Sequence, residues 1–155
     1  MEDSQGFVVT EATSKDVEGI VAFQCLMAKE TEGKTLDPAI VTPAVRAVFD
    51  DSKKGFYLVA RDEEKLVGCL LVTYEWSDWR NCNLWYFQSV FIEQAYRGQG
   101  VFSRMYSEVL ERASKANVMF VRLYVETENK QAQKVYEKLG MKRMPYFMYD
   151  VQLRK

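Results

Sequence analysis

The sequence contains no histidine among its 155 residues. This absence excludes zinc sites that depend on histidine and catalytic triads in which histidine is the base. There are only three cysteines, at positions 25, 69 and 82, and their separations match no metal-ligand spacing. We therefore expect reduced thiols and no metal site.

Long apolar runs and clusters of basic residues are also missing. No stretch approaches the roughly 18 apolar residues that a membrane-spanning helix needs. The N-terminus, Met-Glu-Asp-Ser-Gln-Gly, is acidic and polar and lacks the apolar core of a signal peptide. We expect a cytoplasmic protein with no membrane contact. The net charge of −1, without clustered Lys or Arg, argues against nucleic acid as a partner.

What the sequence does contain is ordinary for a soluble globular protein. Hydrophobic residues make up 48% of the chain and charged residues 28%. A chain of this length buries roughly two-thirds of the surface that its unfolded form exposes. Residues 1–155 are therefore predicted to form a single domain.

One stretch in the middle of the chain combines a strand, a glycine turn and a helix. Residues 84–92 are mostly aromatic and aliphatic and predict a strand, and residues 101–110 have apolar side chains at helical spacing. Between them lie Gly98 and Gly100, which can adopt positive φ and let backbone N–H groups converge. The start of the helix adds unpaired N–H groups and a partial positive charge. Such a corner favours an anion, most typically a phosphate.

The remaining elements follow from the hydrophobic pattern and from turn and capping residues. A hairpin is expected where two apolar runs flank Asp-Glu-Glu-Lys at 62–65, and proline at position 43 is expected to start a second helix. The predicted order is βααβββαβαβ, with six or seven strands and four helices. Strands are expected at 7–9, 55–60, 66–74, 84–92, 119–125 and 146–151, and helices at 17–26, 43–51, 101–117 and 130–139.

Two motifs in this pattern resemble those of the GNAT superfamily of N-acetyltransferases. The first is the spacing of Arg97 and Gly100, although Phe102 stands where the family has a small residue. The second lies downstream and resembles the family's Asn-x-x-Ala and Tyr-x-x-x-Gly-Phe segments; it comprises Asn129, Ala132, Tyr136, Gly140 and Met141. The resemblance implies the GNAT fold, an α/β (α+β) structure with a mixed sheet and helices on both faces.

The resemblance also implies acetyl-CoA as the cosubstrate. In the family, the fourth strand carries a bulge and diverges from the fifth, and a bulge N–H near Ser89 or Val90 would face the thioester oxygen. Asn129 would bond the cofactor or cap its helix. The pantetheine arm would follow Val90, Phe91 and Ile92, and the pyrophosphate would be wrapped by Arg97, Gly98, Gln99, Gly100, Val101, Phe102 and Ser103.

The resemblance assigns Tyr136 the role of protonating the departing CoA thiolate. A phenol has a pKa near 10 and is therefore protonated at pH 7, whereas thiols have pKa values near 8.5. Such a group can donate a proton to a thiolate. The alternative for a tyrosine on an apolar helix stripe is a packing role.

The acceptor side is less well defined by the sequence. Related polyamine acetyltransferases have a glutamate where this chain has Gln88, and an amide cannot act as a base at pH 7. Glu30 and Glu75 are therefore the candidate catalytic carboxylates, together with Glu32 and Asp78. Their expected role is to hold and orient an amine. Two tryptophans nearby, at positions 76 and 79, suggest a ligand wall or a homodimer surface.

These features predict an N-acetyltransferase that moves an acetyl group from acetyl-CoA to a primary amine of a small molecule or peptide, by direct attack on the thioester. Two alternatives remain open. One is a non-catalytic acyl-CoA-binding or sensing domain, and the other is an acyltransferase that uses a longer acyl-CoA. Glu126 and Glu128 follow a later strand and keep a nucleotide-binding fold as a third, weaker alternative.

Overall fold

The computed structural model describes residues 6–154. The first part of the chain forms β1 (Phe7–Glu11), α1 (Val17–Glu32), α2 (Pro38–Asp50), β2 (Phe56–Asp62) and β3 (Lys65–Ser77). The second part forms β4 (Cys82–Ile92), α3 (Val101–Lys115), β5 (Val121–Arg122) and α4 (Lys130–Lys138). Two short 3-10 helices, η1 (Ser14–Asp16) and η2 (Gln94–Tyr96), precede α1 and the glycine turn.

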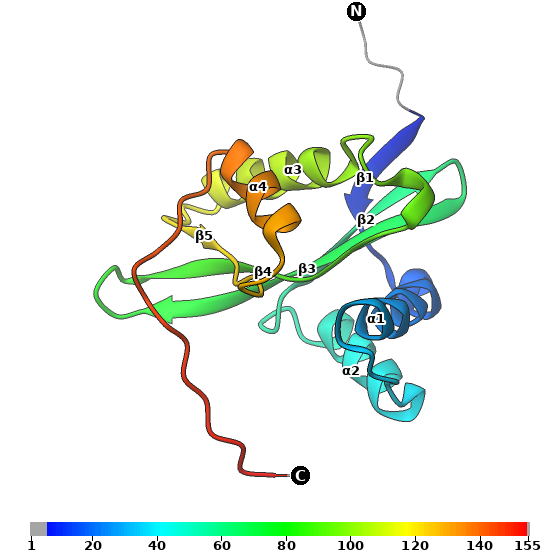
Figure 1. The fold of residues 1–155 in the computed structure, drawn as a ribbon, viewed down its shortest axis with the longest axis horizontal. Coiled ribbons are helices and arrows are strands. Elements are labelled where there is room, and N and C mark those ends of the chain that lie inside the picture. The colour runs from blue at the N-terminus through cyan, green and yellow to red at the C-terminus, as the bar shows by residue number, and fades with distance from the viewer. Residues whose placement is uncertain (1–5, 155) are drawn as a thin grey trace, which may run out of the picture. The chain divides into compact units, whose positions relative to one another are not determined.

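The strands form one mixed sheet in the order β1-β2-β3-β4-β5. Neighbouring strands from β1 to β4 are antiparallel, whereas β5 runs parallel to β4. Helices α1 and α2 lie on one face of this sheet and α3 lies on the other (Figure 1). The predicted fold class, a mixed sheet with helices on both faces, is therefore confirmed.

The chain divides into two compact units, the first ending at Leu123 and the second beginning at Tyr124. The first unit contains the whole sheet together with α1, α2 and α3. The second unit contains α4 and the residues that follow it. That residues 1–155 form a single domain stays a prediction.

The face of the sheet that carries α1 is packed with aliphatic and aromatic side chains. Ile20 and Phe23 of α1 are buried against the sheet, and the ring centroids of Phe23 and Phe91 lie 4.9 Å apart. Tyr57 of β2 belongs to the same cluster, and its ring stacks on Phe49 of α2 at 5.8 Å. This cluster fixes α1 over the middle of the sheet.

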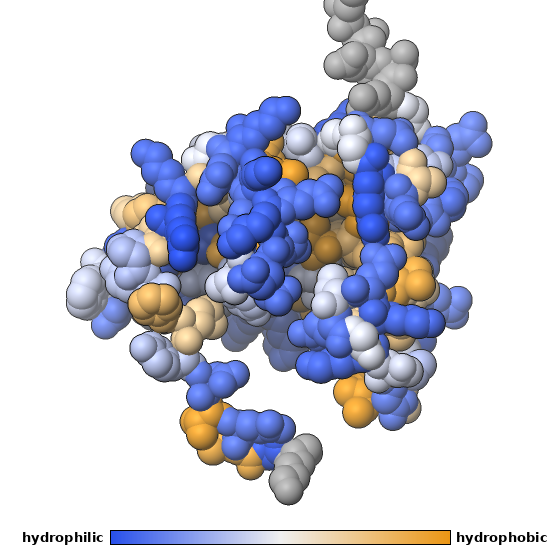
Figure 2. Space-filling view, in the orientation of Figure 1, coloured by the Kyte–Doolittle hydropathy of each residue, from blue (hydrophilic) through white to orange (hydrophobic). Residues whose placement is uncertain are grey.

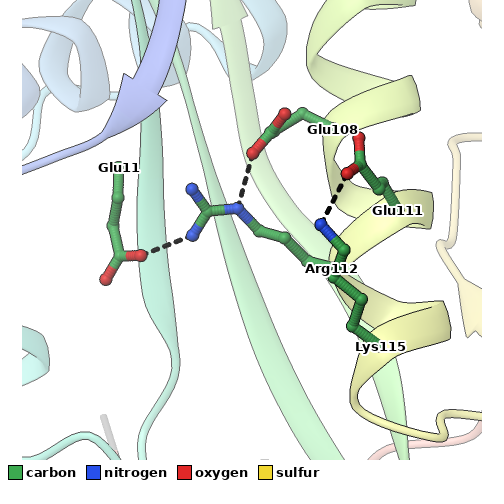
Figure 3. A network of polar contacts seen from close by, with 5 residues as sticks. All are labelled: Glu11, Glu108, Glu111, Arg112 and Lys115. Atoms are coloured by element: carbon green, nitrogen blue, oxygen red, sulfur yellow. Dashed lines mark hydrogen bonds and ion pairs between the residues drawn. The ribbon is translucent and has the colours of Figure 1, made fainter.

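On the other face, α3 presents the apolar stripe that its sequence predicts. Val101, Met105 and Val109 are each at most 1% exposed. Near the end of the helix, Arg112 donates to Glu108 in the preceding turn and to Glu11 of β1 (Figure 3). The same guanidinium lies 5.7 Å from the ring of Phe56 in β2. Helix α3 is thus tied to β1 and β2 as well as to the core.

A buried ion pair attaches the start of α1 to β2. Asp16 is 5% exposed, accepts a hydrogen bond from the backbone N–H of Thr13 at 2.8 Å and pairs with Arg61. Burial opposes the ionised form, but the Thr13 and Arg61 hydrogen bonds outweigh it and lower the pKa of Asp16 below its ordinary value. The carboxylate therefore stabilises the folded protein at neutral pH.

We expect Asp16→Asn to lower the free energy of unfolding at pH 7 by about 2–3 kcal/mol, since it removes a hydrogen-bonded, largely buried charge. Because the folded-state pKa is lowered, this contribution is present above the unfolded pKa of about 3.9 and is lost as the pH falls further. Urea unfolding at pH 7 and pH 3 measures the difference. The exposed Asp50→Asn is the control, and an equal loss in both variants would contradict the assignment.

The bounds of two elements, α2 and β3, differ from the sequence-based prediction. Helix α2 begins at Pro38 rather than Pro43, because Asp37 accepts a hydrogen bond from the N–H of Ala39 at 2.9 Å and caps the helix. Pro43 lies inside the helix. Strand β3 continues to Ser77, so that Glu75 and Trp76 lie on a strand rather than in a loop.

The predicted strand at 146–151 is wrong for this structure, in which residues 143–154 contain no helix or strand. The predicted strand at 119–125 is reduced to the two residues of β5. A strand exists only while a neighbouring strand supplies its hydrogen bonds. Among the described residues, none pairs with 146–151, and β5 pairs with β4 alone. None of the helices within residues 6–154 is long and apolar enough to cross a membrane.

Candidate functional site

The glycine turn before α3 has the geometry that the sequence predicts. Gly98 has φ of +75° and Gly100, the N-cap residue of α3, has φ of +82°. These values lie in the left-handed region that favours glycine. The first N–H to donate within the helix is that of Arg104, which bonds the carbonyl of Gly100 at 3.0 Å. The N–H groups of the first turn therefore point toward the glycines, as an anion site requires.

Arg97 holds the start of this turn in place. Its Nε donates to the carbonyl of Ile92 at 2.8 Å, and its guanidinium lies 5.6 Å from the ring of Phe91. Its Nη2 donates to the carboxylate of Glu30 in α1 at 2.7 Å. Arg97 thus links the turn to β4 and α1 by its side chain, which leaves backbone groups as the means by which the turn would contact a phosphate.

Strand β4 carries a bulge at Ser89 and Val90. Gln88 pairs with Leu71 of β3, whereas Phe91 pairs with Cys69, so two residues of β4 stand opposite one residue of β3. Ser89 has φ of +50°. A bulge turns backbone groups away from the ladder, and here it does so at the position that the family resemblance indicates for the thioester oxygen.

The bulge also exchanges the faces of β4. Side chains alternate along a regular strand, so residues 87 and 91 would lie on the same face. Instead, Phe87 stacks on Tyr106 of α3 at 5.7 Å, and Phe91 packs on Phe23 of α1. One extra residue therefore lets β4 contribute an aromatic ring to each of the two cores.

Beyond Tyr86, strand β4 has no β5 residue beside it. The parallel pairing consists of Trp85 with Val121 and Tyr86 with Arg122, while β4 itself continues to Ile92. Within the first unit the pairing of β4 with β5 thus ends at Tyr86, three residues before the bulge begins at Ser89. The edge of β4 along Val90, Phe91 and Ile92 is where an extended ligand could pair with backbone groups.

Phe102 packs against neighbouring aromatic rings. It is half-buried, with its ring 6.1 Å from that of Phe87 and 6.2 Å from that of Tyr106. The structure thus places the ring on the sheet side of α3. In this position Phe102 packs as part of the aromatic cluster between α3 and the sheet.

We expect Phe102→Ala to lower the free energy of unfolding by about 2–3 kcal/mol, somewhat less than the loss for a fully buried phenylalanine. Phe102→Leu is the control, because it keeps an apolar side chain against Phe87 and should lose less than half as much. Chemical denaturation measures both. An alanine variant with unchanged stability and several-fold tighter CoA binding would instead indicate a ring that obstructs the ligand.

The two candidate catalytic carboxylates lie in different clusters. Glu30 pairs with Arg97, beside the glycine turn. Glu75 on β3 accepts a hydrogen bond from the Tyr86 hydroxyl at 3.2 Å and lies 3.9 Å from Arg122. Since Tyr86 and Arg122 form the last β4–β5 pair, the Glu75 cluster lies where this pairing ends. Sequence reasoning missed Arg122, which only cross-strand register brings to Glu75.

The other acceptor-side candidates are exposed. Glu32 pairs with Lys34 at 3.5 Å, and Asp78 accepts a hydrogen bond from the N–H of Trp79 at 2.9 Å. Trp79 itself is 89% exposed and Trp76 is 60% exposed. Asp78 and Trp79 lie in the turn between β3 and β4, and Trp76 lies near the end of β3, whereas Glu32 ends α1.

The second unit contains the remaining predicted residues. The side chain of Asn129 accepts a hydrogen bond from the N–H of Ala132 at 3.1 Å, so its capping role is confirmed. Gly140, with φ of +91°, follows the end of α4 as predicted. Tyr136 lies on α4, and burial raises its pKa above the ordinary tyrosine value. Within residues 6–154, no group of three or more acidic, Cys or His side chains could hold a metal ion.

A protein-family model agrees with this architecture. The model of the acetyltransferase (GNAT) family matches residues 25–141. A bovine thialysine N-epsilon-acetyltransferase (Bos taurus) is 33% identical over 75 residues. That match covers 48% of this chain and 44% of the bovine enzyme, so the chain spans less than half of this relative.

Solved structures extend the similarity to nearly the whole chain. A possible acetyltransferase from Clostridium difficile 630 is 38% identical, with a TM-score of 0.89 over 97% of this chain and 100% of that one. A predicted acetyltransferase from Clostridium acetobutylicum, solved with acetyl-CoA, has a TM-score of 0.77 over 95% and 96% of the two chains. At 16% identity, the latter likeness concerns the fold alone. With the family model matching residues 25–141, this chain belongs to the GNAT family of acetyltransferases.

Proposed function

We propose that this protein is an acetyl-CoA-dependent N-acetyltransferase that acts on a primary amine. The observation that carries the proposal is the combination, within the first unit, of the glycine turn at Gly98–Gly100 and the open edge of β4 beside its bulge. An anion-binding helix start and an unpaired strand edge fit the two ends of acetyl-CoA, a pyrophosphate and an amide-containing arm.

Bound acetyl-CoA would supply an activated acetyl group as a thioester. The N–H groups of the first turn of α3 and of the glycine turn would hold the pyrophosphate, since their partial positive charges favour an anion. The backbone of Val90, Phe91 and Ile92 would hold the arm, and a bulge N–H would stabilise the negative charge that develops on the carbonyl oxygen. Asn129 would add a side-chain contact to the cofactor.

Tyr136 would supply a proton to the leaving thiolate. Burial raises the pKa of its phenol, so the group stays protonated at and above physiological pH. Thiols have pKa values near 8.5, so the thiolate that accepts this proton leaves as the thiol at pH 7, and the phenolate regains its proton from solvent. The supporting observations are the raised pKa and the match of Tyr136 to the family motif.

The absence of histidine and the burial of Cys69 support direct transfer of the acetyl group from acetyl-CoA to the amine. There is no histidine to activate a nucleophile. Cys69 is fully buried in β3, and burial raises its pKa to about 12, so it stays a thiol at neutral pH. A thiol in that state is a poor acyl carrier, because the reactive form is the thiolate. Cys69 is therefore not the acyl carrier in this proposal, and the acceptor amine is the attacking group.

For the acceptor, we favour a primary amine held by the Glu75 cluster. This carboxylate lies where the pairing of β4 with β5 ends, beside the hydroxyl of Tyr86, and its charge would attract an ammonium group. Gln88, next to the bulge, would offer an amide oxygen to the amine rather than a base. The bovine relative's name, which specifies an N-epsilon amine, supports a primary amine as the acceptor class.

A screen of amines tests the proposal. The protein is incubated with acetyl-CoA and individual primary amines, secondary amines and alcohols, and release of the CoA thiol is measured. We expect release with at least one primary amine and none with the matched alcohol. Acetyl-CoA binding without release in any reaction would favour a sensing domain. Faster release from a longer acyl-CoA would favour the alternative acyl donor.

Glu75→Gln should raise KM for the amine about tenfold while kcat changes less than threefold, because the carboxylate binds the ammonium group and does not remove its proton. The matched control is Asp78→Asn, an exposed carboxylate on the adjacent turn. Initial rates over a range of amine concentrations separate the two constants. A kcat reduced to background, together with loss of an acidic limb near pH 6–7, would identify Glu75 as a general base and contradict this role.

A further inference from the structure

One half-buried arginine of the first unit lacks the hydrogen bonds that its counterparts make. Hydrophilic residues cover much of the face of the molecule that Figure 2 draws. Where arginines are half-buried, the protein supplies acceptors, and Arg61 and Arg112 each donate to carboxylates. Arg122 is also half-buried but donates no hydrogen bond within the first unit, where Oε2 of Glu75 lies 3.9 Å from its Nη1. A guanidinium has several N–H donors, so this one can receive an acceptor from a ligand.

The Glu75 cluster, which consists of Glu75, Tyr86 and Arg122, presents both signs of charge side by side. Its members come from the adjacent strands β3, β4 and β5. The Tyr86 hydroxyl and the Arg122 guanidinium both approach Oε2 of Glu75, which leaves Oε1 for a ligand. A ligand that used both Oε1 and the guanidinium would need a positive and a negative group close together.

The Glu75 cluster lies on the same face of the sheet as Gln88, the residue next to the bulge. Leu71 packs against the core cluster of α1, and it pairs with Gln88. Thr73, two residues further along β3, pairs with Tyr86. Alternate residues of a strand share a face, and directly opposite residues point to the same side. Gln88 and Tyr86 therefore both lie on the α1 face, whereas Phe87 between them packs against α3.

The Glu75 cluster and the bulge are too far apart to hold the same atom. Three residues separate Tyr86 from Ser89, and at a rise of 3.4 Å per residue they span roughly 10 Å. In the function proposed above, the thioester lies at the bulge and Glu75 holds an ammonium group. One acceptor meets both conditions if its reacting amine is at one end of a chain and its charged head group is at the other.

We propose that the acceptor is an α-amino acid whose side chain ends in a primary amine, with its head group in the Glu75 cluster and its side chain directed along β4 to the bulge. The α-carboxylate accepts from Arg122, since a guanidinium can form two parallel hydrogen bonds with a carboxylate. The α-ammonium group donates to Oε1 of Glu75. This inference rests on the proposed function and specifies its acceptor.

The charges around the Glu75 cluster favour this head group over its rivals. The guanidinium groups of Arg80 and Arg122 lie 5.1 Å and 5.4 Å from the same ring, that of Phe120, so two positive charges stand on the side assigned to the carboxylate. A simple diamine would place a second ammonium group beside Arg122, where like charges repel. A phosphate without an ammonium group would meet the negative charge of Glu75.

A set of matched acceptors tests the proposal with the unaltered protein. Lysine carries all the groups required, cadaverine lacks the carboxylate, ε-aminocaproate lacks the α-ammonium group, pentylamine lacks both, and norleucine lacks the reacting amine. Release of the CoA thiol gives kcat/KM for each. We expect kcat/KM for lysine to exceed that for cadaverine and for ε-aminocaproate at least about tenfold, because each loses a charged hydrogen bond. Norleucine should give no release.

The outcomes separate this inference from the function on which it rests. Equal kcat/KM for lysine and pentylamine, or release with norleucine as fast as with lysine, would overturn the amino-acid acceptor while N-acetyl transfer stands. Release with none of the amines would overturn both.

Two variants assign the head group to its residues. Arg122→Gln should reduce the preference for lysine over cadaverine about tenfold, and Glu75→Gln should reduce the preference for lysine over ε-aminocaproate to a similar extent. Each preference compares two acceptors on one protein, so a general loss of stability or of acetyl-CoA binding cancels. Glu64→Gln, at an exposed position between β2 and β3, is the control and should change neither preference. A preference that survives intact in both cluster variants would overturn the proposal.

Discussion

Replacing Tyr136 with phenylalanine should lower kcat about 100-fold or more while leaving the Kd for acetyl-CoA nearly unchanged. General acid catalysis typically contributes 10²- to 10⁴-fold, and phenylalanine keeps the ring while it removes only the hydroxyl. A loss confined to kcat indicates an interaction made in the transition state. Steady-state kinetics with a saturating amine, together with calorimetric titration of acetyl-CoA, measure the two quantities.

The pH dependence adds a second readout for Tyr136. Because burial raises the pKa of Tyr136 above the ordinary tyrosine value, any fall of kcat from loss of this proton should occur at a higher pH than it would for an ordinary tyrosine. Tyr146→Phe is the matched control, because Tyr146 is exposed and lies beyond the end of α4, and it should leave kcat unchanged. An equal reduction of kcat and acetyl-CoA affinity in Tyr136→Phe would assign the residue to binding instead.

The second large effect is expected at the glycine turn. Gly100→Asp should weaken the affinity for CoA about 100-fold or more, because it places a carboxylate at the helix start that would hold the pyrophosphate, and opposed like charges cost several kcal/mol. Each tenfold change in affinity corresponds to about 1.4 kcal/mol. Isothermal titration of CoA into the folded variant measures the change.

Gly100→Asn separates charge from shape. Asparagine has nearly the same size as aspartate and tolerates the left-handed conformation that Gly100 adopts at φ of +82°. We therefore expect at least tenfold tighter CoA binding for the asparagine variant than for the aspartate variant. If both variants bind CoA as the unaltered protein does, and both are folded, the pyrophosphate does not lie at this turn.

The sequence predicts much of this architecture because many signals are local. The glycine turn follows from Gly98 and Gly100, and the apolar stripe of α3 follows from helical spacing. The start of α2 is harder, since Pro38 and Pro43 both suit a first helical position and only the hydrogen bond to Asp37 distinguishes them. Apolar and polar residues alternate in part of the predicted strand at 146–151. A strand also needs a neighbouring strand to pair with, which a local pattern does not reveal.

The site depends on long-range register to a greater extent. The bulge near Ser89 is indicated by family resemblance, but the exchange of faces between Phe87 and Phe91 emerges only from pairing with β3. The partners of Glu75 are likewise cross-strand neighbours. The contact of Arg97 with Glu30 joins residues 67 positions apart in the chain. No local pattern encodes such contacts, because they arise when separate elements pack together.

The fate of an isotopically labelled acetyl group tests the central claim most directly. Acetyl-CoA labelled in its acetyl group is incubated with the protein, with and without a primary amine that supports thiol release, and the products are separated by mass spectrometry. We predict that label leaves CoA only when the amine is present and appears in an amide of that amine, in equal amount to the free CoA. Label that becomes attached to the protein without amine, or that stays on CoA with every amine, would contradict direct N-acetyl transfer.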